Sequence, residues 1–485
     1  MSEKYNLKRG GFTYFAGQMY FMKNILLVLC LAWWGGSLQA QTDSTPNSHS
    51  ISRKYYVDTI QSASLNAKRK IKVYLPDDFK PTNKYPVIYV LDENWLFDPV
   101  VNDVVKLQDF SVIPPCIVVG INSPNRNYDL TPNLNTGAFT GWNKKFHDYL
   151  TQEVPAHIAR KYSTPVFNIL VGHSDGATFA QNAMTASPAA FRGVIGLSQN
   201  LFGDELEQYI NYSQGNFTNN NYYFVASGTR DATSRLRSGR KLDSLFQLNS
   251  NPYLKVKHEV YAADHSGIAG MGLANGLGFV FSDYYQPNGW DRELADSLRK
   301  IHMDPTVLIQ NTLDRINGIY GIDAKADRNA IMDLAFGIVT NKDQAKSYLA
   351  YMKEHLKIDD QFNSSAAQLY ERISEYDIAL EYWTNYLNDP ASYKSNFFYF
   401  RRPIELIAYK MNKPEKAIAF AEEWEKLAPA SVQLSFKFFI AKVASDKKVL
   451  KKKGKQNIDA FIKQYDATKT QYSMDDARKL QSLLE

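Results

Sequence analysis

The chain has 485 residues, of which 44% are hydrophobic and 22% charged, and its formal net charge is +6. This is the composition of an ordinary globular protein, and the length predicts more than one domain. The net charge is moderate, which argues against a nucleic-acid-binding protein. Lysines are dense only in residues 447–455, and such a run is typical of a solvated helix end or loop.

The N-terminal segment has the pattern of a signal peptide that begins at Met22. Lys23 precedes the apolar run Ile25–Trp34, and small residues lead to Ala40, after which we expect cleavage. The run is too short to cross a bilayer comfortably, so we expect a mature chain without a membrane span, located in the periplasm or secreted. Residues 1–40 therefore comprise an upstream segment and a signal peptide, and we hypothesise that translation starts at Met22.

The two cysteines of the chain bear on its redox chemistry. Cys30 lies inside the predicted signal peptide, which leaves Cys116 as the only thiol of the mature chain. An internal disulfide is therefore excluded, although an exported protein would be allowed one. Cys116 begins an apolar run, so we interpret it as a buried strand residue and not as a nucleophile or a zinc ligand.

Residues 41–53 are polar and predict a flexible leader, and residues 54–285 alternate between short apolar runs and segments with helical spacing. Buried strands alternating with helices predict an α/β domain whose mostly parallel sheet is covered on both faces. Helical spacing is present at 146–162, and residues 272–285 are expected to form the closing helix. The predicted strands are 54–60, 70–75, 87–91, 117–121, 167–171, 194–197, 222–226 and 256–261.

The most specific chemical motif is Gly172-His173-Ser174-Asp175-Gly176, which follows the predicted strand 167–171 and precedes an alanine-rich helical segment. A serine at a sharp turn from strand to helix, between two glycines, is the G-x-S-x-G nucleophile elbow. Glycines allow this turn to pack without a Cβ clash, and the helix directs backbone N–H groups at a developing oxyanion. The pattern predicts that Ser174 is a nucleophile.

A serine nucleophile needs a base, and the chain has eight histidines. His265 lies on the loop 262–267 directly after the last predicted strand, where this fold places its base. It is therefore the predicted base, and the alternative is a histidine that only caps a loop. The other histidines are excluded by their positions. His49 lies in the leader, His302 and His355 in the helical region, and His147 and His157 on the helix before the nucleophile. His173 adjoins Ser174, where the turn should direct it away, and His258 lies within a predicted strand.

The third member should be an acid that lies between the nucleophile and the base in the chain, after another strand. Asp231 meets this condition, because it follows the predicted strand 222–226 through a short turn that contains glycine. Its carboxylate would accept a hydrogen bond from the imidazole and fix the imidazole tautomer. Asp264 and Asp243 remain as alternative acids.

Two backbone N–H groups are needed to bind the oxyanion of the tetrahedral intermediate. One is expected from Asp175, directly after the nucleophile. The second is expected from the loop after the predicted strand 87–91, through the main chain of Glu93 or Asn94.

After the α/β domain no strand-like run stands out, and residues 290–485 are predicted to form an all-α domain. Similar segments recur around Ala345, Ala379 and Ala417, at intervals of 34 and 38 residues. This period, with a proline after each of the last two copies, resembles tetratricopeptide repeats, in which a small residue lets paired helices approach closely. A plain helical bundle is the alternative. Stacked helix pairs would offer a surface to a protein partner or to a second copy of the chain.

Further motifs occur in a fixed order along residues 54–285. They are Tyr85–Asp92, Pro114–Ile121, Arg126 with Asp129–Pro132, Gly172–Gly176, and His265 with Gly276–Phe279. The set resembles the putative esterase family of α/β-hydrolases, which includes enterochelin esterases, feruloyl and acetyl-xylan esterases, and mycolyltransferases. The resemblance implies the α/β-hydrolase fold with Ser174, Asp231 and His265 as its triad. The chain departs from the family at Glu93, where glycine is common.

No motif identifies the substrate. Phe139 and Trp142 follow the Asp129–Pro132 motif and are expected to line an acyl or alcohol pocket, with plain core positions as the alternative. The resemblance implies a small-molecule, carbohydrate or siderophore ester. Aspartates and histidines do not cluster at ligand spacing, and no glycine-rich phosphate loop follows a strand. No metal or organic cofactor is therefore expected.

We expect a serine carboxylic-ester hydrolase that forms an acyl-enzyme on Ser174. The first alternative is an acyltransferase of the same fold, which passes the acyl group to a sugar or lipid alcohol instead of water. The second is a binding or scaffold protein in which the tetratricopeptide-like helices act and the hydrolase domain is vestigial. The complete set of three triad residues argues against the second alternative.

Overall fold

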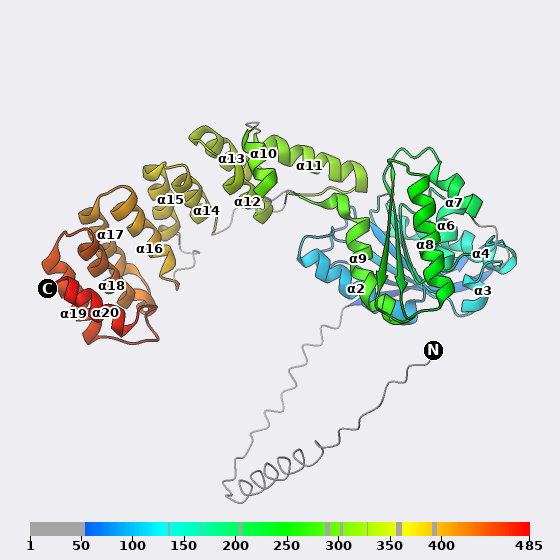
Figure 1. Ribbon diagram of the computed structural model, residues 1–485, viewed down its shortest axis with the longest axis horizontal. Helices are drawn as coiled ribbons and strands as arrows, with labels where there is room; N and C mark the ends of the chain where they lie inside the picture. Colours follow the sequence, from blue (N-terminus) through cyan, green and yellow to red (C-terminus); the bar gives the residue numbers. More distant parts are fainter. Residues whose placement is uncertain are drawn as a thin grey trace, which may run out of the picture. The chain divides into compact units, whose positions relative to one another are not determined.

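The computed structural model describes residues 54–133, 136–165, 167–202, 206–286, 292–300, 304–326, 328–355, 361–389 and 395–485. The upstream segment, the predicted signal peptide and the leader, residues 1–53, lie outside the described residues. Within them, an α/β part is followed by a series of helices (Figure 1).

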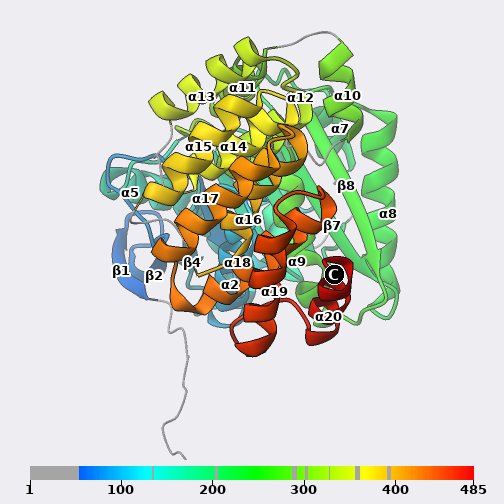
Figure 2. The same ribbon diagram turned by 90° about the vertical axis from the view of Figure 1, so that its left-hand side faces the viewer.

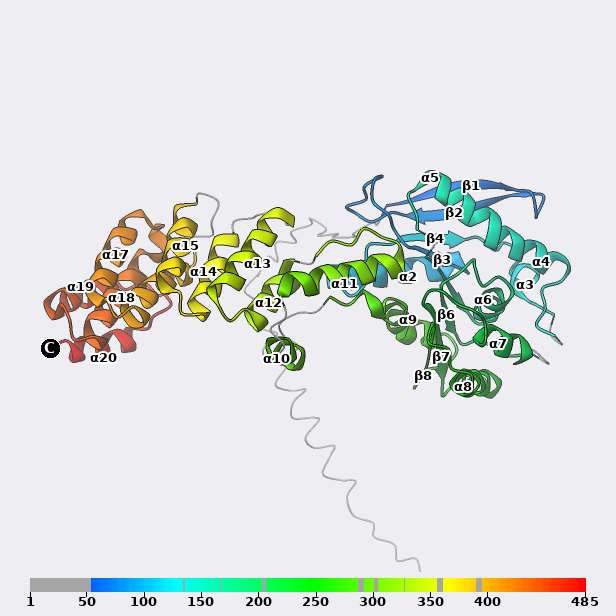
Figure 3. The same cartoon turned by 90° about the horizontal axis from the view of Figure 1, so that it is seen from above.

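The sheet of the α/β part is built from strands that correspond to the predicted ones. They are β1 (Tyr55–Ser62), β2 (Ala67–Tyr74), β3 (Val87–Val90), β4 (Ile117–Ile121), β5 (Asn168–His173), β6 (Gly193–Leu197), β7 (Asn221–Gly228) and β8 (Leu254–Tyr261). Their order in the sheet is β1-β2-β4-β3-β5-β6-β7-β8 (Figure 3). β2 pairs antiparallel with β1 and β4, and the remaining pairs are parallel. The predicted α/β fold with a mostly parallel sheet is confirmed.

Helices cover both faces of this sheet. They are α2 (Glu93–Asp109), α3 (Arg126–Leu130), α4 (Gly141–Asp148), the π-helical η1 (Tyr149–Glu153), α5 (Val154–Lys161), α6 (Asp175–Ala186), α7 (Leu206–Ser213), α8 (Thr233–Leu248), α9 (Gly267–Val280) and the 3₁₀ turn η2 (Ser282–Tyr284). In β3, Val87 and Tyr89 pack into the core beneath α4 to α8, whereas Ile88 and Val90 pack on the opposite face beneath α2 and α9. Because both faces are covered, the central strands β3 to β7 are almost entirely buried, whereas β1, β2 and β8 include exposed or half-buried polar residues.

Two predicted helices have different bounds in the structure. The helix expected at 146–162 begins earlier, at Gly141, and the π turn η1 separates it into α4 and α5. The closing helix expected at 272–285 is α9, which begins at Gly267 and ends at Val280. Its glycines disfavour a helix by local propensity, but they allow close packing on the sheet. A Cβ on Gly276 would lie 2.7 Å from Cγ2 of Ile195.

The rest of the described chain is helical. Its elements are α10 (Arg292–Lys300), α11 (Pro305–Tyr320), α12 (Arg328–Ile338), α13 (Lys342–His355), α14 (Phe362–Arg372), α15 (Tyr376–Asn388), α16 (Phe398–Glu405), the π-helical η3 (Leu406–Lys410), α17 (Pro414–Leu427), α18 (Ala430–Asp446), α19 (Lys451–Lys463) and α20 (Met474–Leu483). Figures 2 and 3 show α13 to α20 following one another in chain order. Ala345, Ala379 and Ala417 are fully buried near the starts of α13, α15 and α17. The tetratricopeptide-like interpretation stays a prediction.

One ion-pair cluster joins consecutive helices of this region. The indole N–H of Trp383 on α15 donates to Oε1 of Glu371 on α14 at 2.6 Å. Arg402 on α16 donates to Oε2 of the same carboxylate at 2.7 Å. Trp383 is fully buried, so this hydrogen bond lies inside the helical core.

Helix α11 belongs to the core of the α/β part. Tyr320, at its C-terminal end, is fully buried and packs edge-to-face against Phe167, with ring centroids 4.8 Å apart. Its hydroxyl donates to the Val280 carbonyl at 3.3 Å and accepts from the Asp283 N–H at 3.1 Å. The sheet core therefore extends beyond the closing helix α9 and includes α11.

Among the described residues, no helix combines the length and the apolar character that a membrane span requires.

Candidate active site

Ser174 lies at the turn between β5 and α6, where the backbone adopts an unusual conformation. Its backbone angles φ and ψ are 59° and −121°, a combination that residues other than glycine rarely adopt. Gly172 makes the turn sterically possible, because a Cβ there would lie 2.3 Å from the carbonyl oxygen of Gly176. The Ser174 N–H donates to the Leu197 carbonyl at 2.9 Å, which fixes the turn to the end of β6. These features are those of a nucleophile elbow.

The three predicted triad residues are brought together at the carboxyl edge of the sheet. Ser174 Oγ lies 3.0 Å from Nε2 of His265, and Nδ1 of His265 lies 3.0 Å from Oδ1 of Asp231. The side chain of Asp231 is 3% exposed and that of His265 is 41% exposed. The acid is therefore shielded from water, while the base faces the solvent side where a substrate could enter.

Asp231 is held as a carboxylate. Its burial raises the pKa, but hydrogen bonds from Ser198, from the Ala232 N–H and from His265 outweigh this effect, so the pKa of Asp231 is lowered. The alternative acids lie elsewhere: Asp264 accepts from the Gly267 N–H at the start of α9, and Asp243 lies within α8.

The predicted oxyanion donors lie at the starts of two helices. Asp175 is the first residue of α6, and Glu93 and Asn94 are in the first turn of α2, after Asp92 with φ of 57°. Backbone N–H groups in a first helical turn have no partner within the helix and attract negative charge. The Glu93 carboxylate is bonded elsewhere, to Lys72 at 2.7 Å and to Asn122.

An arginine joins the two loops that carry these N–H groups. Arg126 donates to both carboxylate oxygens of Asp92, at 2.7 and 3.0 Å, and contacts Oδ2 of Asp175 at 3.4 Å. Arg235 of α8 donates to the other oxygen of Asp175 at 3.3 Å. The bidentate pair fixes the Asp92 loop relative to the start of α6, so the expected donors are held at a constant separation.

Sequence reasoning missed two residues that contact the predicted base. The imidazole of His173 lies against that of His265, with centroids 4.6 Å apart, and its Nε2–H donates to the His265 carbonyl at 2.7 Å. Burial lowers the pKa of His173 and favours the neutral ring, whose tautomer with a proton on Nε2 makes this bond. Ser198 contacts both His265 and Asp231. The sequence signal that could have indicated Ser198 is its position at the end of β6, because the carboxyl ends of the parallel strands meet at this edge.

The expected substrate-binding residues have different environments. Phe139 is partly buried and stacks on His147 and Phe179, with centroids 4.4 and 4.9 Å away, so it contributes to the core. Trp142 remains 36% exposed, and its indole N–H donates to Oδ1 of Asp129 at 2.7 Å. The exposed ring of Trp142 is therefore available to a ligand, whereas Phe139 supports the helix beneath it.

Asp129 anchors this region through a buried ion pair. Its two carboxylate oxygens accept from Arg69 of β2 at 3.1 and 3.3 Å, and Asp129 is fully buried. Its carbonyl accepts from the Asn143 side chain at 2.7 Å. The helices α3 and α4, which carry Arg126 and Trp142, are thus fixed to the sheet by one residue.

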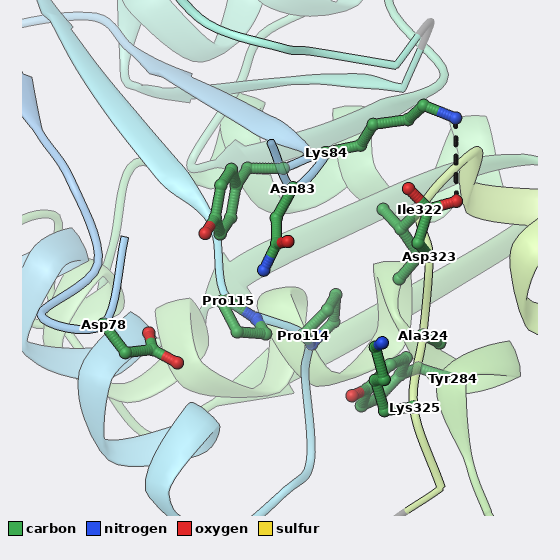
Figure 4. Close-up of a pocket in the computed structure, with 11 residues that line it drawn as sticks. Asp78, Asn83, Lys84, Pro114, Pro115, Tyr284, Ile322, Asp323, Ala324 and Lys325 are labelled. Atoms are coloured by element: carbon green, nitrogen blue, oxygen red, sulfur yellow. Dashed lines mark ion pairs between the residues drawn. The ribbon is translucent and has the colours of Figure 1, made fainter. Parts of the chain in front are cut away.

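A cavity of about 220 Å³ lies at the opposite edge of the sheet from Ser174 (Figure 4). Tyr85 and Pro115 line it just before β3 and β4 begin, whereas Ser174 follows the carboxyl end of the parallel strand β5. Lys84 and Asp323 form an ion pair there at 3.6 Å. None of its lining residues is a serine, cysteine or histidine, so it lacks the serine–histidine pair found around Ser174. In the described part of the chain, no cluster of acidic, histidine or cysteine side chains could hold a metal ion.

Comparison with protein families gives one match to this chain. Residues 62–237 match the model of the family described as Putative esterase. The match confirms the resemblance seen in the sequence and supports a carboxylesterase-type hydrolase. The matched segment includes Ser174 and Asp231. No curated protein matched the sequence.

Solved structures share the fold at low identity. An uncharacterised protein from Capnocytophaga ochracea is 19% identical with a TM-score of 0.56, over 73% of this chain and 100% of that chain. An IroE-like serine hydrolase from Shewanella oneidensis is 19% identical with a TM-score of 0.48, over 67% and 100% of the two chains. A siderophore hydrolase from Aspergillus nidulans is 18% identical with a TM-score of 0.42, over 49% and 97%. At these identities the likeness concerns the fold alone.

Proposed function

We propose that the protein is a serine carboxylic-ester hydrolase that works through an acyl-enzyme on Ser174. The observation that carries the proposal is the continuous hydrogen-bonded chain from Ser174 Oγ through His265 to Asp231. The family match supports the reaction class, and the strained backbone at Ser174 supports its assignment as nucleophile.

Acylation follows from this geometry. As Ser174 Oγ bonds to the ester carbonyl carbon, its proton passes to Nε2 of His265, 3.0 Å away. The resulting imidazolium is stabilised by the ionised Asp231, which also holds the ring with Nδ1–H toward the carboxylate. The tetrahedral intermediate then collapses, the bond to the alcohol oxygen breaks, and the alcohol leaves with the proton from Nε2.

The negative charge on the former carbonyl oxygen needs donors that do not move during the reaction. We assign these to the backbone N–H of Asp175 and to that of Glu93 or Asn94, at the starts of α6 and α2. One such donor contributes about 10²- to 10³-fold to kcat in serine hydrolases. The pairing of Arg126 with Asp92 keeps the two helix starts in place.

Deacylation repeats the proton transfers with water in place of the alcohol. Water gives a proton to Nε2 of His265, attacks the acyl carbon, and releases the carboxylic acid as Ser174 recovers its proton. An acyltransferase would differ only in using a sugar or lipid alcohol at this step. Product analysis with an added alcohol separates the two, because transfer consumes ester without releasing acid.

The test compares hydrolysis of short p-nitrophenyl acyl esters by the purified protein and by Ser174→Ala. Removal of the nucleophile should lower kcat on the order of 10⁶-fold. A fluorophosphonate probe should label the wild type and spare Ser174→Ala, while the exposed serine variant Ser234→Ala should label like the wild type. Equal hydrolysis and labelling of wild type and Ser174→Ala would contradict the proposal.

We also propose that the protein acts in the periplasm or outside the cell, on the basis of the signal-peptide pattern after Met22. N-terminal sequencing of the protein from its host should find a start near Gln41. Recovery of an intact first methionine would contradict this localisation.

A further inference from the structure

Ser198 occupies a place that mirrors that of Ser174. It directly follows β6, as Ser174 directly follows the neighbouring strand β5, and it has a positive φ of 63°. Left-handed backbone at a residue other than glycine is uncommon and needs surrounding contacts to hold it. Ser174 and Ser198 thus follow adjacent strands at the same edge of one sheet, and both have a positive φ. A turn at the end of a strand does not by itself require this conformation, so the contacts of the Ser198 side chain need to be considered.

The main chain of Ser198 is fixed on both sides. Its N–H donates to the Ala226 carbonyl of β7 at 2.9 Å, and its carbonyl accepts from Nη1 of Arg235. The same guanidinium donates to Asp175, the residue after the nucleophile. Ser198 is therefore tied to the strand that leads to the acid and to the residue that is the expected oxyanion donor.

Its side chain reaches the acid and the base together. Ser198 Oγ donates to Oδ2 of Asp231 and lies 3.0 Å from Nδ1 of His265. Oδ1 of Asp231, the other carboxylate oxygen, accepts from the Ala232 N–H at 2.6 Å and from His265. Each carboxylate oxygen thus has its own donor, and rotation of the carboxyl group would break both sets of bonds.

The proton of the Ser198 hydroxyl points to Asp231, so an oxygen lone pair is left to face the imidazole. A lone pair near Nδ1 favours the tautomer with a proton on Nδ1 and leaves Nε2 free to accept from Ser174. Ser198 is 1% exposed and cannot face a substrate. Its effect must therefore pass through Asp231 and His265.

We infer that Ser198 is a positioning residue, whose hydroxyl fixes the Asp231 carboxylate and the Nδ1–H tautomer of His265. The inference rests on the proposed function, because it assigns these two residues as acid and base. Ser198 itself forms no bond to the reacting atoms. The hydrogen bond from its hydroxyl to Asp231 is one cause of the lowered pKa of that carboxyl, in agreement with the geometry.

The experiment measures kcat and KM for Ser198→Ala and Ser198→Gly. Both variants lose the hydroxyl, and glycine also relieves the positive φ, so the second variant folds even where the first is impaired. We expect kcat to fall about 10- to 100-fold in both, the range of a hydrogen bond to a charged group, with KM unchanged. Ser213→Ala is the matched control, since Ser213 is 1% exposed and donates within α7 to the Ile210 carbonyl.

A double-mutant cycle shows whether Ser198 acts through Asp231. Asp231→Ala alone should lower kcat about 10⁴-fold. Adding Ser198→Ala to it should cause no further loss, because the hydroxyl then has no carboxylate to position. Multiplied losses in the double variant, or wild-type kcat in both Ser198 variants, would overturn the inference. Failure of the proposed function itself would appear separately, as full activity of Ser174→Ala.

Discussion

The carboxyl edge of the sheet and the C-terminal helices hold their polar groups in different ways. At the sheet edge, Ser174, Ser198, Asp231 and His265 come from separate strand ends and meet within hydrogen-bonding distance. In the helical region, Glu371 bonds to Trp383 and Arg402 on the two helices that follow it. The first arrangement combines distant parts of the chain, whereas the second links neighbours.

This difference predicts how far a perturbation spreads. A change at the sheet edge alters residues that share partners, so stability and activity should fall together. A change between consecutive helices should stay local, as in proteins whose repeats contact mainly their neighbours. The first two of the three predictions that follow test this contrast, and the third concerns an ion pair that lies in neither region.

The largest effect is expected from Asp129→Ala, which leaves Arg69 buried without its counter-charge. Breaking a buried ion pair costs about 3–5 kcal/mol, and the bond from Trp142 is lost as well. Urea unfolding should show this destabilisation, and kcat should fall because α3 and α4 lose their anchor. The control Asp148→Ala removes a surface carboxylate that pairs with Lys144, and it should cost at most about 1 kcal/mol. If Asp129→Ala were strongly destabilised but fully active, stability and activity would not be coupled in this part of the molecule, and the expected contrast would be wrong.

One substitution made in both regions gives a matched comparison. Trp142→Phe and Trp383→Phe each remove an indole N–H that donates to a carboxylate, Asp129 or Glu371. A hydrogen bond to a charged group contributes about 1.5–3 kcal/mol, so both variants should lose stability by about that amount. Ester hydrolysis should fall in Trp142→Phe and stay at the wild-type level in Trp383→Phe. A reduced kcat in Trp383→Phe would mean that the helical region is coupled to the site.

The smallest effect concerns Asp58, which joins β1 to α5. It accepts from Nε2 of His157 at 2.7 Å and from Lys161 at 2.6 Å. Burial raises its pKa, but these hydrogen bonds outweigh burial and lower the pKa of Asp58 to about 2. Asp58→Asn should lower the unfolding free energy by about 1 kcal/mol at neutral pH, since the pair is partly exposed.

The pH dependence of this difference has a definite direction. The pKa of Asp58 is lower in the folded than in the unfolded protein, so its contribution is complete above about pH 4 and is lost as the pH falls toward 2. The wild type and Asp58→Asn should therefore converge in stability in this window, as measured by urea unfolding at several pH values. A difference that stays constant down to pH 2 would contradict the assignment.

The central strands β3 to β7 were predictable because they are buried on both faces and contain apolar runs. The predicted strand 117–121 has the bounds of β4, whereas β7 continues to Gly228, past the predicted end at 226. Ser227 and Gly228 still pair with Val260 and Tyr261 of β8, although neither is apolar. Backbone pairing with a neighbouring strand, and not hydrophobicity, sets that end.

The candidate site was predictable where chain order and strand ends constrain it. Ser174, Asp231 and His265 each follow a strand, and parallel strands bring such positions to one edge. Ser198 also follows a strand, but the partners of its hydroxyl, Asp231 and His265, could not be predicted from the sequence pattern. The contact of His173 with His265 likewise depends on how the end of β5 packs against the loop after β8. These residues are far apart in the chain, so the sequence pattern does not indicate the contact.

Tyr320 has a consequence for the order in which the protein is made. Chains emerge from the ribosome from the N-terminus, and domains fold as they are completed. The sheet core includes Tyr320 and Ile322, which follow His265, the proposed base, by more than fifty positions in the sequence. Until these residues have emerged, the aromatic surface around Phe167 lacks this cover, so a nascent chain that already contains Ser174, Asp231 and His265 is still exposed to aggregation.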